Sequence, residues 1–118
     1  MELSEEQTIF QIILHSGNSR AESYKAIKEA REGNFTLAQE ALEKSREELD
    51  RAHKIHREIL EDTEKITSSP ALLMVHGEDH LMIAMAENTL ISEMLEQFKL
   101  IHKLSVRIEE LEKHVRRD

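Results

Sequence analysis

The segment Val75-His76-Gly77-Glu78-Asp79-His80-Leu81-Met82 holds the residue types that are best placed to do chemistry in this chain. His76 and His80 are four residues apart, so on a helix their side chains are neighbours, and Asp79 follows His76 by three residues. Imidazole titrates near pH ~6.5, so at neutral pH it offers a nitrogen lone pair to an electrophile or a metal. The segment therefore indicates a nucleophilic or metal-ligating histidine beside an acid.

Asp79 interrupts an apolar stripe. Leu72, Val75, Asp79, Met82 and Ala86 recur every three or four residues, which is the pattern of one face of a helix. We therefore expect Asp79 to be a buried acid on an inward face. A buried carboxylate is costly unless a metal, an opposite charge or several hydrogen bonds meet it, so the pattern favours a functional role for this acid.

The composition predicts an all-helical protein of one domain. The 118 residues include three glycines, one proline and 3% aromatic residues, whereas 34% are charged, a balance typical of long helices. The absence of cysteine excludes disulfides and thiolate zinc sites. The net charge of −8 disfavours nucleic acid as a partner. Without a secretory signal pattern or an apolar run of about 18 residues, we expect a soluble cytoplasmic protein with no direct membrane insertion.

Three helices are expected, over about residues 4–32, 34–65 and 69–104. The first begins at Ser4, with Gln7 as its capping-box partner, and should end before Gly33, which suits a left-handed position after a helix. Its predicted inner face consists of apolar and small residues: Phe10, Ile13, Leu14, Gly17, Ala21, Tyr24 and Ile27.

The second helix is expected to follow Asn34 as its N-cap and to bury a heptad-like stripe. That stripe comprises Ala38, Leu42, Ser45, Leu49, Ala52, His56 and Ile59. Ser69 as N-cap with Pro70 at the first helical position predicts the start of the third helix.

The third helix is apolar around more of its circumference than two neighbouring helices can cover. Its apolar residues are Leu72, Leu73, Val75, Leu81, Met82, Ile83, Met85, Leu90, Ile91, Met94, Leu95, Phe98, Ile101 and Leu104. A helix that is apolar most of the way round is buried all round, so we expect this helix to pack against copies of itself in an oligomer. Residues 105–118 keep a thinner apolar stripe and are predicted to form a helical C-terminal extension, whose role the sequence does not reveal.

Further motifs accompany the histidine segment in a fixed order. Residues 72–82 are similar to L-L-x-V-H-A-Q-D-H-L-M, and Ser16-Gly17-Asn18-Ser19-Arg20 is similar to S-G-x-A-R. Tyr24-Lys25-Ala26 and Gly33-Asn34-Phe35 are similar to A-Y-x-A and G-D-F, and Ala52-His53 begins a segment like A-H-x-x-Q-T. Together, over residues 9–104, they resemble the lactose/cellobiose-specific enzyme IIA family of the phosphoenolpyruvate-dependent sugar phosphotransferase system.

The resemblance implies a fold and an activity. Residues 1–104 would form an enzyme IIA-like antiparallel three-helix subunit that assembles through its third helix into a homotrimer. His76 would accept a phosphoryl group from the carrier HPr and pass it to the IIB component, which serves the IIC membrane component. The imported sugar would be a β-disaccharide such as lactose, cellobiose or chitobiose. His80 would orient His76 or contact the phosphate.

The resemblance also implies a metal site. Asp79 would lie on the threefold axis and share a divalent metal with its two copies. Three like charges on an axis cannot all stay ionised without compensation, and magnesium suits oxygen ligands.

Two residues of the histidine segment depart from the family pattern, and His56-Arg57 replaces the Gln-Thr pair of the second-helix segment. Gly77 replaces an alanine and is expected to loosen the helix and widen access to His76. Glu78 replaces a glutamine. It would repel a phosphoryl group if it pointed toward His76, and would have no such effect if it pointed away.

Other readings remain open on the residues alone. A non-catalytic metal-binding helical bundle would explain His76-x-x-Asp79-His80, and a histidine phosphotransfer domain of two-component signalling would explain a reactive histidine on a helix. His53 and His56 are three residues apart, but a packed pair on the inner stripe explains them better than a metal site does.

Overall fold

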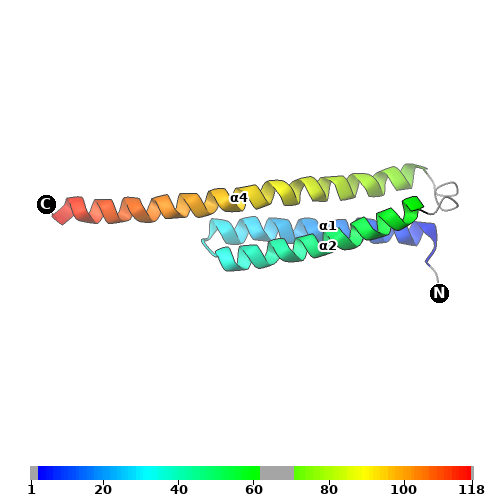
Figure 1. The fold of residues 1–118 in the computed structure, drawn as a ribbon, viewed down its shortest axis with the longest axis horizontal. Helices are drawn as coiled ribbons and strands as arrows, with labels where there is room; N and C mark the ends of the chain where they lie inside the picture. The colour runs from blue at the N-terminus through cyan, green and yellow to red at the C-terminus, as the bar shows by residue number, and fades with distance from the viewer. Residues whose placement is uncertain (1–2, 62–70, 118) are drawn as a thin grey trace.

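The protein is a bundle of three helices, seen in a computed structural model that describes residues 3–61 and 71–117. The helices are α1 (Glu5–Arg31), α2 (Phe35–Glu61) and α4 (Ala71–Arg117). In Figure 1, α1 and α4 run in the same direction and α2 runs against both, so consecutive helices are antiparallel. The all-α three-helix fold predicted from the sequence is confirmed, and no strand occurs within the described ranges.

The turn signals in the sequence act as predicted at both ends of α1. The Ser4 hydroxyl accepts from the Gln7 backbone N–H at 3.1 Å, and the Gln7 side chain accepts from the Ser4 N–H at 2.9 Å. After α1, Gly33 has φ +84, the left-handed conformation that only glycine adopts without strain. The Gly33 and Asn34 N–H groups donate back to Ala30 and Glu29 carbonyls, which closes a Schellman motif.

Asn34 connects the end of α1 to the start of α2. Asn34 directly precedes α2, and its carbonyl accepts from Ala38 N–H at 2.9 Å. Its side-chain amide donates to the Glu29 carboxylate at 2.9 Å, tying the turn to the end of α1. The predicted Ser69 cap and Pro70 lie outside the described residues.

Two apolar clusters form the core. The cluster nearer the start of α4 consists of Ile9, Ile12, Leu49, Ala52, Ile59, Leu81 and Ala84. The other, nearer the α1–α2 turn, consists of Ala26, Ala30, Ala38, Ala41, Leu42, Ile91 and Leu95. Small side chains dominate the second cluster, so the helices can approach closely there.

A buried polar cluster lies along the core. The Ser45 hydroxyl of α2 lies 2.8 Å from Ser19 Oγ and 2.7 Å from Ser23 Oγ, both on α1. It donates to the Ser19 carbonyl at 2.9 Å and accepts from the Asn88 amide of α4 at 2.9 Å. Because its members bond to one another, the cluster joins all three helices at one level of the bundle and fixes their register.

The predicted inner face of α1 is wrong at five of its seven positions, and only Ile13 and Ile27 pack against the core, whereas that of α2 is confirmed. Phe10, Leu14 and Tyr24 are each at least half exposed, and Gly17 and Ala21 are also exposed. The buried side of α1 is a second stripe with the same spacing, made of Ile9, Ile12, Ser16, Ser19, Ser23, Ala26 and Ala30. In α2 the predicted apolar residues and Ser45 are buried, and His56 is nearly so.

The third helix and the helical extension expected after residue 104 form one continuous helix. It passes residue 104 without a break and ends at Arg117, a span of 47 residues, or about 70 Å. Figure 1 shows its C-terminal part extending alone beyond the α1–α2 turn. No helix within residues 3–61 and 71–117 combines the length and hydropathy that a membrane span requires.

Candidate functional site

The structure brings the two predicted histidines together near the start of α4. Their Nε2 atoms lie 3.2 Å apart, the ring centroids are separated by 4.6 Å, and the rings are nearly perpendicular at 88°. The His76 side chain is exposed and that of His80 is half-buried. A partner molecule can therefore reach His76, while His80 holds a nitrogen against its Nε2 from the side of the bundle.

Asp79 does not lie in the core of the subunit, contrary to the prediction. Its stripe was assigned correctly as one helical face, but that face points outward, with Leu72 83% and Val75 52% exposed. The helix instead turns Gly77, Leu81 and Ala84 toward α1 and α2. The physical reason is that α4 has two apolar sides, of which a single bundle covers only one. Asp79 is thus an exposed acid in the midst of an exposed apolar face.

Glu78 points away from His76. Its Oε1 lies 3.2 Å from Nε2 of His56, a residue of α2 whose side chain is only 13% exposed. Two residues along a helix are turned by roughly 200°, so Glu78 and His76 occupy opposite sides of α4. The repulsive placement considered for this acid is therefore not the one observed.

Gly77 serves the packing of α4 on α1. It is buried, and a Cβ atom added to it would lie 3.0 Å from Cγ2 of Ile9. The expectation that this glycine opens access to His76 is wrong, because its Cα faces α1 and not the exposed side. Its role is to let α1 come close directly beneath the histidine pair.

Sequence reasoning missed an ion pair that joins α1 to α4. Arg20 donates to Glu87 twice, from Nε to Oε2 at 2.8 Å and from Nη2 to Oε1 at 3.0 Å. The hydrogen bond to Glu87 raises the pKa of Arg20, against a smaller opposing effect of burial. Arg20 belongs to one of the family-like motifs, which was the signal available. The pairing with Glu87 could not be predicted from the sequence, because it depends on which side of α1 faces α4.

A second polar cluster joins α1 to α2. Glu48 Oε2 lies 2.6 Å from Nδ1 of His15 and 3.3 Å from the Asn18 amide, while Oε1 accepts from Arg51 at 2.8 Å. Burial alone would raise the pKa of Glu48, but these hydrogen bonds and the neighbouring positive charges outweigh it, so the pKa is lowered.

The described residues of a single subunit do not form a metal site. Within residues 3–61 and 71–117, no group of three or more histidine, aspartate or glutamate side chains is arranged to hold a metal ion. Asp79 offers a single carboxylate, His76 and His80 face each other, and His56 bonds to Glu78. A metal at Asp79 would thus need carboxylates from other copies of the chain.

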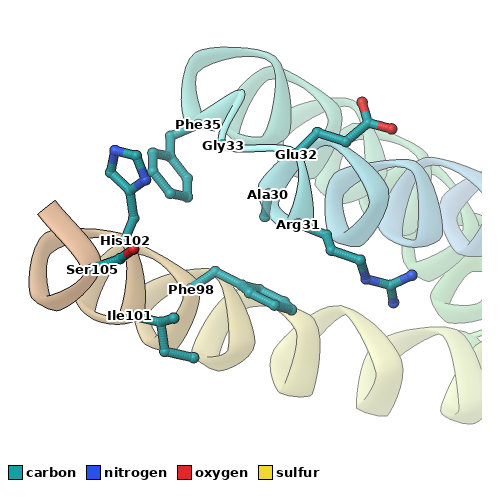
Figure 2. Close-up of a pocket in the computed structure, with 9 residues that line it drawn as sticks. All are labelled: Ala30, Arg31, Glu32, Gly33, Phe35, Phe98, Ile101, His102 and Ser105. Carbon is teal, nitrogen blue, oxygen red and sulfur yellow. The ribbon is translucent and has the colours of Figure 1, made fainter. Parts of the chain in front are cut away.

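A pocket of about 230 Å³ lies at the other end of the bundle from the start of α4. It is formed by the end of α1, the turn and α4, and Figure 2 shows the Phe35 and His102 rings meeting at its side. Their centroids are 5.5 Å apart at 72°. The pocket marks the last contact of α4 with the bundle and is remote from the histidine pair.

Fold and site together define a small helical-bundle protein with a closely spaced histidine pair near the start of its last helix. A sequence model described as "PTS system, Lactose/Cellobiose specific IIA subunit" matches residues 7–99. The chain therefore belongs to the lactose/cellobiose-specific IIA family and is an enzyme IIA component of the phosphotransferase system.

Curated relatives agree with this assignment. The lichenan-specific phosphotransferase enzyme IIA component of Bacillus subtilis is 40% identical over 99 residues, covering 81% of this chain and 88% of that protein. The N,N'-diacetylchitobiose-specific EIIA component of Escherichia coli K12 is 34% identical over 92 residues, covering 77% and 79%.

Solved structures share the fold. The cellobiose-specific enzyme IIA from Bacillus anthracis has a TM-score of 0.79 at 31% identity, covering 87% of this chain and 95% of that one. The solution structure of the IIA(Chitobiose)–HPr complex of Escherichia coli has a TM-score of 0.77 at 29% identity, covering 86% and 99%.

Proposed function

We propose that this chain is a phosphocarrier in which His76 accepts a phosphoryl group from phospho-HPr and passes it to a IIB component during sugar uptake. The observation that carries the proposal is the exposed His76 ring, whose Nε2 lies 3.2 Å from His80 Nε2. A structural relative has been solved in complex with HPr, which supports HPr as the donor. A protein that receives a phosphoryl group from one partner and passes it to another needs a nucleophile that both partners can reach from solution.

The transfer is an in-line exchange between two nitrogens. The lone pair on His76 Nε2 attacks phosphorus, the bond from phosphorus to the donor imidazole breaks, and its electron pair returns to the donor ring. In the second half-reaction a cysteine thiolate of IIB attacks the same phosphorus and His76 Nε2 recovers its lone pair. Such a transfer depends mainly on positioning and on compensating the charge of the phosphoryl oxygens.

His80 is placed to supply part of that compensation. With a phosphoryl group on His76 Nε2, the His80 Nε2–H would lie beside the phosphoryl oxygens and donate to one of them. Before transfer, the same N–H can donate to the His76 lone pair and hold the ring in the tautomer whose proton is on Nδ1. His80 thus acts as a positioning and phosphate-contact residue.

The working unit is proposed to be a homotrimer packed through the outer face of α4. Large apolar side chains at Leu72, Val75, Met82 and Leu90 are 49–83% exposed in the single chain, more than a monomer needs to display on one face. Asp79 lies in this face, so symmetry would bring its copies together. A divalent cation, with magnesium the best match to carboxylate and water ligands, would offset their charge.

The transported sugar and the compartment follow from the same assignment. Two relatives carry the names of a lichenan system and a N,N'-diacetylchitobiose system. We accordingly propose a β-linked disaccharide or short oligosaccharide, selected by the IIC membrane component and not by this chain. A carrier that exchanges phosphate with HPr would work in the cytoplasm.

Phosphate incorporation tests the proposal. The full chain is incubated with phosphoenolpyruvate, enzyme I and HPr, and we expect a single acid-labile phosphate per chain. His76→Ala should abolish incorporation and His80→Ala should slow it, whereas His114→Ala, an exposed histidine on the same helix, should leave it unchanged. Unchanged incorporation in His76→Ala would overturn the assignment of the acceptor.

The two other readings make different predictions in that assay. A histidine phosphotransfer domain would take phosphate from a response regulator and not from HPr. A non-catalytic metal-binding bundle would take none from either donor while remaining folded.

A further inference from the structure

The last 17 residues of α4, 101–117, lead away from the bundle. Only the start of this segment meets the other helices: Ile101, His102 and Ser105 line the pocket at the α1–α2 turn, and the His102 ring contacts Phe35. Every side chain described from Ile101 to Arg116 is exposed, and Figure 1 shows the C-terminal end of α4 extending beyond α1 and α2. An isolated helix of about this length is only marginally stable in water. The segment also lies beyond residues 7–99, which the family shares.

This tail carries the apolar pattern of a coiled coil. Its a and d positions are Ile101, Leu104, Ile108, Leu111 and Val115, which are 49–70% exposed. Shallow depressions run along the same line, one bounded by Ile101, Leu104 and Ile108 and the next by Ile108, Leu111 and Val115. Knobs of a matching helix would fill such depressions.

The charges indicate which helix would match. With Ile101 at a, Arg107 falls at a g position and Glu112 at the following e position. In a parallel, in-register coiled coil, g of one strand faces the next e of its neighbour, so Arg107 would face Glu112 of the partner subunit. An antiparallel pairing would instead set Arg107 against the g positions of the partner, which include another arginine. Within its own helix, the Glu112 carboxylate lies 3.9 Å from the Arg116 guanidinium. This distance is long for an ion pair, so Glu112 can also pair with Arg107 of the partner subunit.

The tail continues a face that already needs covering. The outer face of α4 keeps spacings of three and four residues from Leu72 to Ile101, and it is apolar except at Asp79 and Gln97. Three successive steps of four between Met82 and Met94 act as a stutter that keeps one straight stripe along the whole helix. A partner that covers the first half in register therefore covers the second half as well.

We propose that residues 101–117 form a parallel, in-register coiled coil with the same residues of other copies of this chain. Isoleucine and valine at a with leucine at d favour a coiled coil of as few as two helices. The number of helices in the assembly is set by how the three-helix bundles pack. The tail thus fastens the assembly at a point about 40 Å along α4 from the His76 region, leaving the phosphorylation site clear. The inference concerns self-association and does not depend on the proposed phosphoryl transfer.

Site-directed crosslinking tests the inference, because the chain contains no cysteine. The probe is Leu111→Cys in the full chain, and the matched control is Val106→Cys, which replaces an exposed apolar residue at an f position of the same helix. Each protein is oxidised or treated with a short bismaleimide, at a concentration at which sedimentation shows the oligomer. Leu111→Cys should give a covalent dimer at least tenfold faster than Val106→Cys.

The crosslinking rates distinguish a coiled coil from an unpaired tail. Equal rates for the two variants, or no crosslinking of Leu111→Cys in the oligomer, would overturn the coiled coil. Phosphate incorporation by the uncrosslinked Leu111→Cys protein is measured in parallel, so a failure of the tail is distinguished from a failure of the carrier function. A sedimentation profile of wild-type protein that stays monomeric at all concentrations would also reject the inference.

Discussion

His56 of α2 holds Glu78 of α4 on the side of the helix opposite His76, with 3.2 Å between Nε2 and Oε1. The acid that lies two residues from the proposed acceptor His76 in the sequence thus points away from it in space. In the motifs that this chain resembles, the corresponding positions are both glutamine, whereas here they are an imidazole and a carboxylate. This pair links α2 to the N-terminal part of α4.

We predict that Glu78→Gln leaves phosphoryl transfer within about twofold of wild type, because an acid on the far side of the helix adds little to the potential at His76. A double-mutant cycle with His56→Ala should give a coupling of at most ~0.5 kcal/mol, since the Glu78 side chain is 38% exposed. Rapid-quench phosphorylation and urea unfolding measure the two quantities. An increase in transfer rate of about tenfold or more would mean that Glu78 acts on the site after all.

The two helical glycines should respond oppositely to alanine. Gly17 is exposed with nothing within 4 Å of an added Cβ, so Gly17→Ala should stabilise the fold by about 1 kcal/mol through helix propensity. Gly77→Ala would set a Cβ 3.0 Å from buried Ile9 Cγ2, and overpacking of about 1–3 kcal/mol should cancel or exceed the same gain.

A compensating change separates packing from propensity at Gly77. Ile9→Leu removes the β-branch methyl that the new atom would meet, so Gly77→Ala should be less costly in that background than in wild type. Urea unfolding of the four proteins measures this. Equal effects of Gly77→Ala in both backgrounds would show that Ile9 is not the obstacle.

Acid should remove the stabilisation that Glu48 provides. Its pKa in the folded state lies below the ordinary value of 4.5, so its contribution is complete above pH 4.5 and is lost as the pH falls through the lower folded value. The difference in free energy of unfolding between wild type and Glu48→Gln should shrink in that acidic window. Glu47→Gln, an exposed neighbour, controls for the loss of one charge, and a pH-independent difference for Glu48 would contradict the prediction.

Replacing Asp79 should reveal the oligomer. If the outer faces of α4 meet, Asp79→Leu removes facing carboxylates and extends the apolar face, so the assembly should survive greater dilution and higher temperature than wild type. The variant should also lose any shift of the melting temperature between magnesium and chelator. Asp50→Leu on the exposed side of α2 is the matched control. Sedimentation equilibrium measures the association, and a less stable assembly in Asp79→Leu would refute the packing.

The sequence predicted the parts of the fold that depend on local chemistry. Ser4 and Gln7 form the expected capping box, Gly33 ends α1 in the expected conformation, and His76 and His80 meet because four residues make about one helical turn. Motif similarity alone predicted the family, which the family model over residues 7–99 confirms, and it proposed the candidate site. None of these inferences required knowing how the helices face one another.

Which side of each helix faces the core was harder to predict, because α1 and α4 each carry two stripes of similar spacing. In α1 the more apolar stripe, with Phe10 and Tyr24, remains exposed, while the bundle buries the stripe of serines and alanines. Small side chains let helices approach and serines bond across the contact, a benefit that hydropathy alone does not show. In α4 the stripe containing Asp79 has the right phase but faces outward, since one chain cannot bury both sides.

Phosphorus–nitrogen NMR of the phosphorylated, ¹⁵N-histidine-labelled protein tests the role of the histidine pair most directly. The phosphorus should couple to Nε2 of His76, and that resonance should disappear in His76→Ala while persisting in His114→Ala. A phosphorus coupled to another histidine, or to no nitrogen at all, would contradict the assignment of His76 as the acceptor.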